Sequence, residues 1–150
     1  MSKRKQHAYE VALRMAQVTE LQAQAALAHA VEKEMVAKEH MDDVETARHA
    51  VLSANSACVS DDRQMDLARY ELLTQLDQAL SQRLLLAREA LDEAAQKRNE
   101  KAAENVTAKR RRERVGEHLG EVRRTWLHAQ SAKALEDGVE LWLESREKMP

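Results

Sequence analysis

The feature that most constrains this chain is the near absence of residues that break a helix. Its single proline is the last of 150 residues, and its three glycines, Gly116, Gly120 and Gly138, all lie in the final quarter. Proline costs about 3 kcal/mol and glycine about 1 kcal/mol inside a helix. The chain also has no phenylalanine and only 3% aromatic residues, too few for an ordinary globular core. Such a composition is typical of long helices and coiled coils.

Apolar residues recur three or four positions apart in two segments separated by one polar stretch. In the first segment they are Val11, Met15, Val18, Leu21, Ala25 and Ala28, followed in a shifted register by Ala37, Met41, Val44, Ala47 and Val51. In the second they are Leu73, Leu76, Leu80, Ala87, Leu91 and Ala94, then the more polar Arg98, Ala102 and Val106, then Val115, Leu119, Val122, Trp126 and Ala129. This spacing predicts two helices, each with one narrow apolar stripe, and a stutter in the first.

The stretch LSANSACVSDDRQ separates the two segments. Its Ser, Asn and Asp side chains favour turns, and Ser60 or Asp61 could cap the following helix, with Asp62 in its first turn. The sequence therefore predicts an all-α fold, a single domain over residues 1–150 formed by an antiparallel two-helix coiled-coil hairpin. We expect helix one over about residues 5–54, the turn over about 55–63 and helix two over about 64–148. A long parallel dimer is the less favoured alternative, because its seam would contain the polar break.

A turn centred near Val59 would place residue i opposite residue 118 − i, so that Tyr9 lies near Lys109 and Arg4 near Arg114. Helix two would then overhang helix one beyond about residue 115, by some 30 residues or roughly 45 Å. The overhang would expose Leu119, Val122, Trp126, Leu135, Val139, Leu141, Trp142 and Leu143. Exposed apolar surface of this extent predicts docking of a different protein, although folding back or pairing with another copy would also cover it.

Basic residues concentrate beside this overhang. Seven basic and three acidic residues lie between Lys109 and Arg124, and we call Lys109, Arg110, Arg111, Arg112 and Arg114 the basic cluster. With the predicted pairing, Lys3, Arg4 and Lys5 would lie at the same level and complete a two-stranded collar. The predicted partner-binding residues are Lys3, Arg4, Lys5, the basic cluster, Arg123, Arg124, Trp126, Leu135 and Trp142. Nucleic acid is not expected as a partner, because no aromatic residues interleave with the cluster and no nucleic-acid-binding module is recognised.

The sequence offers no pattern for an enzyme, a metal site or a cofactor. Phosphate-binding glycine loops and HExxH motifs are absent, and Cys58 is the only cysteine, which fits a reducing cytosol. The strongly apolar run at residues 84–87 is too short to cross a bilayer, so direct membrane insertion is not expected. We therefore expect a non-enzymatic protein without catalytic residues, metal ligands or cofactors.

Taken together, these features resemble the FliJ/YscO family of small coiled-coil stalk proteins from type III export systems, flagellar or injectisome. The resemblance covers nearly the whole chain. It rests on the length, the basic N-terminal tip, the segment SANSACVSDD, the segment RYELLTQLDQAL with Tyr70, Leu73, Leu76 and Leu80, and the closing KALEDGVELWLESREK. The glycines and tryptophans near the C-terminus depart from the family pattern.

The resemblance implies a cytoplasmic stalk, peripheral to the inner-membrane secretion apparatus, that inserts its joined ends into the pore of the hexameric export ATPase. The pore-facing end would be residues 3–5 with residues 109–124 and the overhang. The opposite tip, around residues 53–63, would point towards the cytoplasmic domain of the export gate. Because some family members escort chaperones, secretion chaperones are a further expected partner. The alternative functions are a generic self-associating structural coiled coil and, less favoured, a nucleic-acid-binding hairpin.

Overall fold

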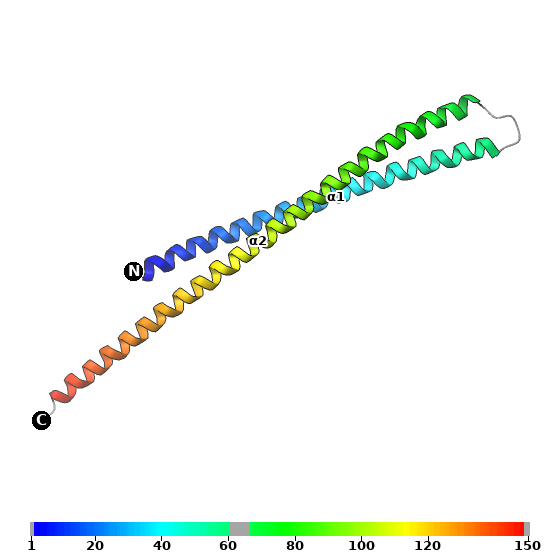
Figure 1. Cartoon of the computed structure of the whole chain (residues 1–150). Coiled ribbons are helices and arrows are strands. Elements are labelled where there is room, and N and C mark those ends of the chain that lie inside the picture. The colour runs from blue at the N-terminus through cyan, green and yellow to red at the C-terminus, as the bar shows by residue number, and fades with distance from the viewer. Residues whose placement is uncertain (1, 61–66, 149–150) are drawn as a thin grey trace. The chain divides into compact units, whose positions relative to one another are not determined.

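The computed structural model describes residues 2–60 and 67–148, and these form two long helices (Figure 1). Helix α1 spans Ser2–Ser60 and helix α2 spans Leu67–Glu147. The helices pack against each other, and the described residues contain no strand. The prediction of an all-α helical hairpin is thereby confirmed.

The predicted end of the first helix is wrong, because α1 continues into the segment expected to form the turn, as far as Ser60. Residues 55–60 are helical, whereas Asp61, Asp62 and the rest of the predicted turn up to residue 63 lie outside the described residues. The half-buried Asn55 and Cys58 lie on the side of α1 that packs against α2. Packing on this side outweighs the local tendency of Ser and Asn to leave a helix.

The packed side of α1 follows a seven-residue repeat without interruption. Most of its buried and half-buried positions alternate by four and three residues; these seam positions are Tyr9, Leu13, Ala16, Glu20, Ala23, Leu27, Ala30, Glu34, Ala37, Met41, Val44, Arg48, Val51, Asn55 and Cys58. This is the spacing of a coiled-coil seam. The predicted stutter is therefore wrong, since one register holds along the whole seam.

The first part of the predicted apolar stripe lies on the opposite side of α1. Val11, Met15, Val18 and Leu21 are 41–66% exposed, while the seam between them uses the small Ala16 and the charged Glu20. The prediction followed the larger apolar side chains. The helix instead buries alanines, and Ala16 and Ala30 are only 5% and 8% exposed. Helix α1 thus carries a second apolar face that does not contact α2.

The seam of α2 follows the predicted stripe more closely. Its positions are Tyr70, Leu73, Asp77, Leu80, Leu84, Ala87, Leu91, Ala94, Arg98, Lys101, Asn105, Ala108, Arg112, Val115, Leu119, Val122 and Trp126. Leu84 and Leu119 are its most buried members, at 3% and 2% exposure. Leu76, Val106 and Ala129, which the prediction included, are exposed.

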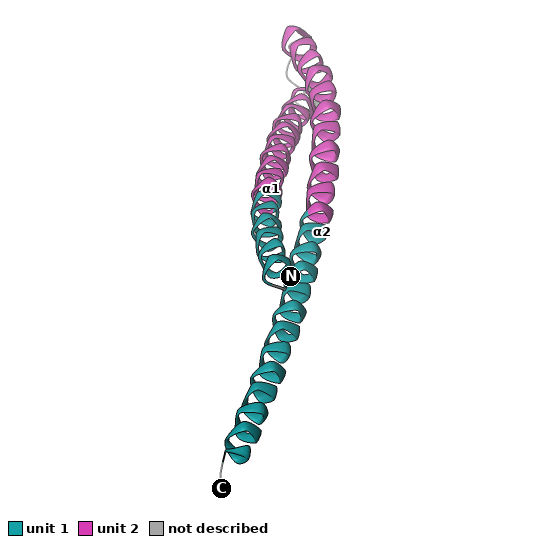
Figure 2. Cartoon of the chain, turned by 90° about the vertical axis from the view of Figure 1, so that its left-hand side faces the viewer, with its two compact units in different colours: residues 1–23, 105–150 teal, residues 24–104 magenta. Residues whose placement is uncertain are grey.

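The chain forms two compact units (Figure 2). Unit 1 comprises residues 1–23 and 105–150, and its seam buries Ala16, Ala108 and Leu119. Unit 2 comprises residues 24–104, and its seam buries Ala30, Val44, Leu84 and Ala87. The single-domain organisation stays a prediction.

Ion pairs occupy seam positions in both units. In unit 1, Arg112 pairs with Glu20, whose side chain is only 12% exposed. In unit 2, Arg98 Nε lies 2.5 Å from Glu34 Oε2, and Arg48 Nε lies 3.2 Å from Asp77 Oδ1. Charged residues at seam positions select one register, because a shifted register would bury each charge without its partner.

Candidate partner-binding surface

Contacts within unit 1 fix which residues of α1 face which residues of α2. The rings of Tyr9 and His118 have centroids 6.2 Å apart, and Arg123 Nη2 donates a hydrogen bond of 3.2 Å to Glu10 Oε1. In these two contacts and in the Glu20–Arg112 pair, the residue numbers of the two partners add to between 127 and 133. The sequence predicted a sum of 118. Each residue of α1 therefore faces a residue of α2 that lies about three helical turns further along the chain than predicted, because α1 runs on to Ser60.

This register separates the two basic groups that were expected to form one collar. Lys5 lines a hollow of ≈250 Å³ with Val122, Trp126 and Ala129, so residues 3–5 lie at the level of residues 121–129. The basic cluster at residues 109–114 lies near α1 residues 16–21, well inside the paired part of unit 1. The two-stranded collar is therefore a wrong prediction. Unit 1 instead has two basic groups at different levels.

The members of these groups differ in what they contact. Lys3, Arg4, Lys5, Lys109, Arg110, Arg111, Arg114 and Arg124 are exposed. Arg112 is half-buried against Glu20, and Arg123, although exposed, bonds to Glu10. The hydrogen bond from Arg123, helped by one of 3.4 Å from Gln6, lowers the pKa of Glu10 below its ordinary value. Two of the predicted binding arginines are thus already engaged within the chain.

The last part of α2 and the turn residue that follows it, together Leu127–Lys148, are exposed at every residue, and we call them the C-terminal segment. Trp126 is the last half-buried residue of α2, and beyond it α2 continues past the N-terminus of α1 (Figure 2). The segment is 22 residues long, or roughly 33 Å as a helix. It begins near residue 127, so the predicted overhang exists but is shorter than expected.

The C-terminal segment has one apolar side and one acidic side. At 3.6 residues per turn, Leu127, Leu135, Val139 and Trp142 fall on one side, and Leu135 and Trp142 are 70% and 57% exposed. The acidic residues fall on the other side; they are Glu136, Asp137, Glu140, Glu144 and Glu147. This acidic side continues the side of α2 that carries the seam residues Val122 and Trp126. The seam pattern thus stops at the level of the N-terminus of α1, and the apolar residues of the C-terminal segment lie on a different side of α2.

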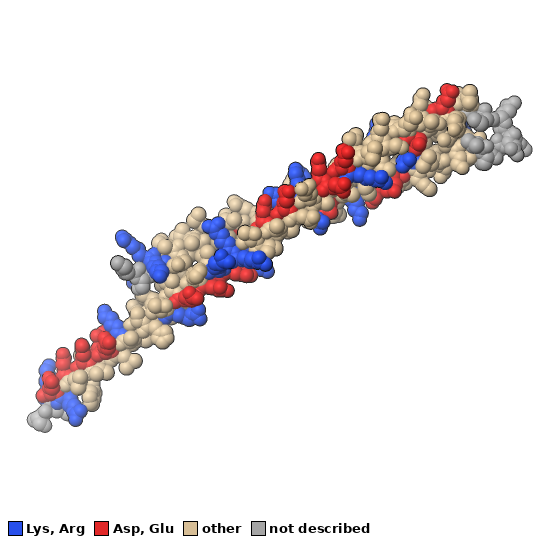
Figure 3. Space-filling model, in the orientation of Figure 1, with Lys and Arg blue, Asp and Glu red and all other residues tan. Residues whose placement is uncertain are grey.

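Acidic and basic side chains are concentrated in different parts of α2. Acidic side chains gather on the C-terminal part of α2, and basic side chains gather nearer the paired region (Figure 3). The guanidinium carbon of Arg146 lies 5.3 Å from the ring centroid of Trp142, which holds this basic group over the apolar side.

The three glycines do not lie against another backbone. A Cβ atom at Gly116 would lie 3.8 Å from Leu13 Cδ1, which is ordinary contact, and at Gly120 or Gly138 it would meet no atom within 4 Å. Within the described part of the chain, close packing therefore does not require these glycines. Their effect is on the helix itself, which each of them softens.

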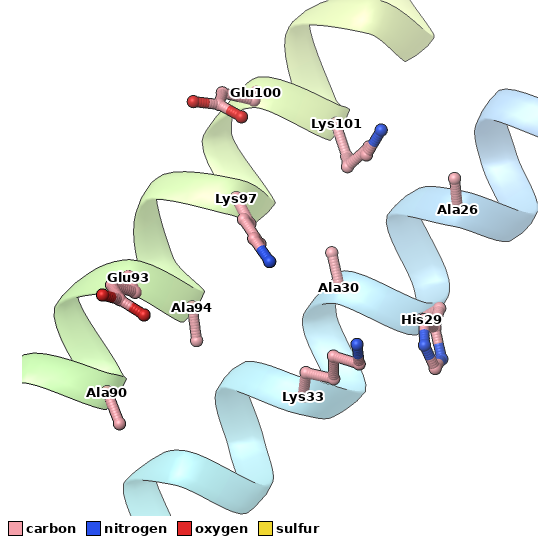
Figure 4. Close-up of a pocket in the computed structure, with 10 residues that line it drawn as sticks. All are labelled: Ala26, His29, Ala30, Lys33, Ala90, Glu93, Ala94, Lys97, Glu100 and Lys101. Carbon is pink, nitrogen blue, oxygen red and sulfur yellow. The ribbon is translucent and has the colours of Figure 1, made fainter. Parts of the chain in front are cut away.

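Unit 2 contains a hollow of ≈530 Å³ between α1 and α2 (Figure 4). Ala30 and Ala94 point into the gap, whereas Glu93 and Glu100 point away from α1. Three lysines, Lys33, Lys97 and Lys101, line it as well. The hollow follows from alanines at facing seam positions, which are too small to fill the space between the helices.

Residues 2–60 and 67–148 contain no group of three or more His, Cys, Asp or Glu side chains that could hold a metal ion. They also contain no helix long and apolar enough to cross a membrane. Cys58 is a half-buried seam residue. The absence of an enzymatic activity stays a prediction.

Neither a scan against protein-family models nor a search of the curated proteins finds a match for this chain.

The sequence analysis did not predict two residues that shape the candidate surface, Glu10 and Glu20. A signal for Glu20 was present, because Glu20 and Glu34 are as far apart in α1 as Arg98 and Arg112 are in α2. Equal spacing of opposite charges is what an antiparallel seam with two ion pairs requires.

Proposed function

We propose that this chain is a non-enzymatic stalk protein of a type III export system, of the FliJ/YscO kind. In this proposal unit 1 binds the hexameric export ATPase, and the chain links the ATPase to the cytoplasmic domain of the export gate and so aids protein export. The protein would act in the cytoplasm beside the inner-membrane apparatus. Secretion chaperones are a further proposed partner.

The observation that carries the proposal is the C-terminal segment, a helix exposed at every residue in the unit that also holds the N-terminal part of α1. Six of its large apolar side chains are 48–70% exposed. Burying one such side chain gains about 1.5–3 kcal/mol, so docking would release a considerable free energy. A single unpaired helix in water is otherwise only marginally stable.

The basic residues refine where a partner would make contact. Lys109, Arg110, Arg111 and Arg114 are exposed on α2 and would meet acidic groups or carbonyl oxygens of a ring. Arg112 and Arg123 contribute less, since each is paired with a glutamate of α1. Electrostatic complementarity of this kind mainly sets orientation and the rate of encounter.

The test is ATP hydrolysis by the export ATPase of the same organism, with the full-length chain added over a range of ratios. We expect stimulation that saturates near one chain per hexamer, and its loss in the variant Leu135→Ser/Trp142→Ser. The matched control is Met35→Ser/Val36→Ser, which removes apolar side chains of similar exposure from unit 2. Unchanged hydrolysis with no co-elution of the two proteins would refute the proposal.

A further inference from the structure

The hollow of unit 2 opens on one edge of the seam. Four of the residues that line it come immediately before a seam residue of their own helix; they are Ala26 and Lys33 on α1 and Ala90 and Lys97 on α2. Because all four line the same hollow, the two helices border it from opposite sides. Ala30 and Ala94, which are seam residues, point into it (Figure 4). The hollow is therefore an open groove, and we call it the alanine groove.

The alanine groove is long enough for several turns of a third helix. Its lining residues span 26–33 of α1 and 90–101 of α2, which is about 11 Å and about 17 Å along the two helices, or about two to three helical turns. The alanine side chains end at a methyl group, so they leave a space of ≈530 Å³. Side chains of a further helix can insert into a space of this kind as knobs into holes.

The charged groups that face the alanine groove are basic. Lys33 lies on the α1 border and Lys97 on the α2 border, and neither forms an ion pair or hydrogen bond with any other of residues 2–60 and 67–148. Glu93 and Glu100 are four and three residues from Lys97, yet both point away from α1, whereas Lys97 extends toward it (Figure 4). Lys101 is already paired with a glutamate of α2. Lys33 and Lys97 are therefore the two lysines available to a carboxylate of another molecule.

We propose that the alanine groove binds an amphipathic helix of a partner protein. The partner helix has small apolar side chains in one narrow stripe and acidic residues along both edges of that stripe. The stripe lies over the alanines, and the acidic edges meet Lys33 on one side and Lys97 on the other. Because the edges adjoin the stripe, one docked helix makes both kinds of contact at once. Docking of an amphipathic helix in a groove is a recurring mode of recognition.

The pattern of charge argues that the occupant is not the C-terminal segment of a second copy. The acidic residues of that segment lie on the side opposite to its apolar residues, so a segment docked through its apolar side would hold its carboxylates away from the lysines. The groove also does not depend on the proposed function, because it lies in unit 2, whereas the ATPase contact is assigned to unit 1. The two proposals can therefore be tested separately.

The test uses the full-length chain and a synthetic peptide of about 18 residues, or five helical turns. The peptide carries alanine and leucine in one stripe and glutamate along both edges, and its binding is followed by fluorescence anisotropy. We expect saturable binding that weakens as the salt concentration rises, and a dissociation constant at least tenfold higher for K33E/K97E. A peptide of the same composition, reordered so that no stripe forms, should bind at least tenfold more weakly.

The matched control is K38E/R88E, which reverses the same number of charges at exposed residues of unit 2. Both residues come immediately after a seam residue, so they lie on the other edge of the seam. This variant should bind the peptide with a dissociation constant within twofold of that of the unmodified chain. A loss of binding as large as in K33E/K97E would overturn the proposal, because it would mean that only the total charge matters.

A second variant fills the alanine groove without changing a charge. In A30L/A94L the hollow accommodates the added groups, so Tm should not fall, while the dissociation constant for the peptide should rise at least tenfold. Undiminished binding by a folded A30L/A94L chain would overturn the proposal; if that variant does not fold, the K33E/K97E result decides. The absence of saturable binding to the unmodified chain, or equal binding of the reordered peptide, would also overturn it. So would tighter binding of dodecanoate than of the peptide, which would indicate a site for a small anion with an apolar tail.

Discussion

The Glu20–Arg112 pair offers a direct test of how the seam of unit 1 is held in register. The Glu20 side chain is 12% exposed and that of Arg112 is 34% exposed. Breaking a fully buried pair costs about 3–5 kcal/mol, and a hydrogen bond to a charged group contributes about 1.5–3 kcal/mol. Because Arg112 retains a third of its exposure, we expect Glu20→Gln or Arg112→Gln alone to cost about 2 kcal/mol.

The measurement is a double-mutant cycle by chemical and thermal unfolding, followed by far-ultraviolet circular dichroism. Each single variant should lower Tm by about 4–8 °C, taking about 2–4 °C per kcal/mol for a chain of this length. The double variant should be less destabilised than the sum of the singles, with a coupling of about 1–2 kcal/mol.

A matched control is the pair Lys101–Glu104, 3.2 Å apart and 39% and 59% exposed. An exposed pair of this kind contributes only about 0.3–0.5 kcal/mol, so its cycle should show little coupling. A coupling below about 0.3 kcal/mol for Glu20–Arg112 would refute the reasoning, because it would mean that the two side chains do not interact across the seam.

Two further predictions concern the ends of unit 1. The hydrogen bond from Arg123 lowers the pKa of Glu10. At any pH above the ordinary glutamate pKa of about 4.3, Glu10 is charged and the pair stabilises the start of α1. This stabilisation is lost as the pH falls through the lowered pKa of Glu10. Hydrogen exchange corrected for intrinsic rates should show this acid-induced opening in the unmodified chain and not in Glu10→Gln; equal acid sensitivity in both would contradict it. Gly138→Ala should slow exchange in the C-terminal segment by stabilising the helix by about 1 kcal/mol, since the added Cβ meets no atom within 4 Å. Faster exchange would mean that the glycine conformation is needed.

The helical class and the two-helix arrangement could be predicted because almost nothing in the chain breaks a helix. The end of α1 could not be predicted from local preferences, since the segment at residues 53–60 is rich in Ser and Asn. A longer-range signal was present. Residues at intervals of seven, including Ala16, Ala23, Ala30 and Ala37, continue to Cys58, which is the repeat that the seam follows.

The candidate surface was predictable in part. Trp126, Leu135 and Trp142 do lie at or beyond the end of the seam, because the pairing of two unequal helices leaves the longer one uncovered. The level of the basic cluster was wrong, since an error of a few residues in the turn is doubled across a hairpin. The more hydrophobic face of α1 was taken for the seam, because alanine and ion pairs were given less weight than Val11 and Met15.

The most direct test of the central claim is hydrogen exchange of the C-terminal segment, with and without the export ATPase, at a concentration where the chain is monomeric. An unpaired helix should exchange rapidly, and the account predicts that Leu127–Lys148 becomes protected when the ATPase is present. Protection confined to other parts of the chain, or none at all, would contradict the assignment of this segment as the partner-binding part of the protein.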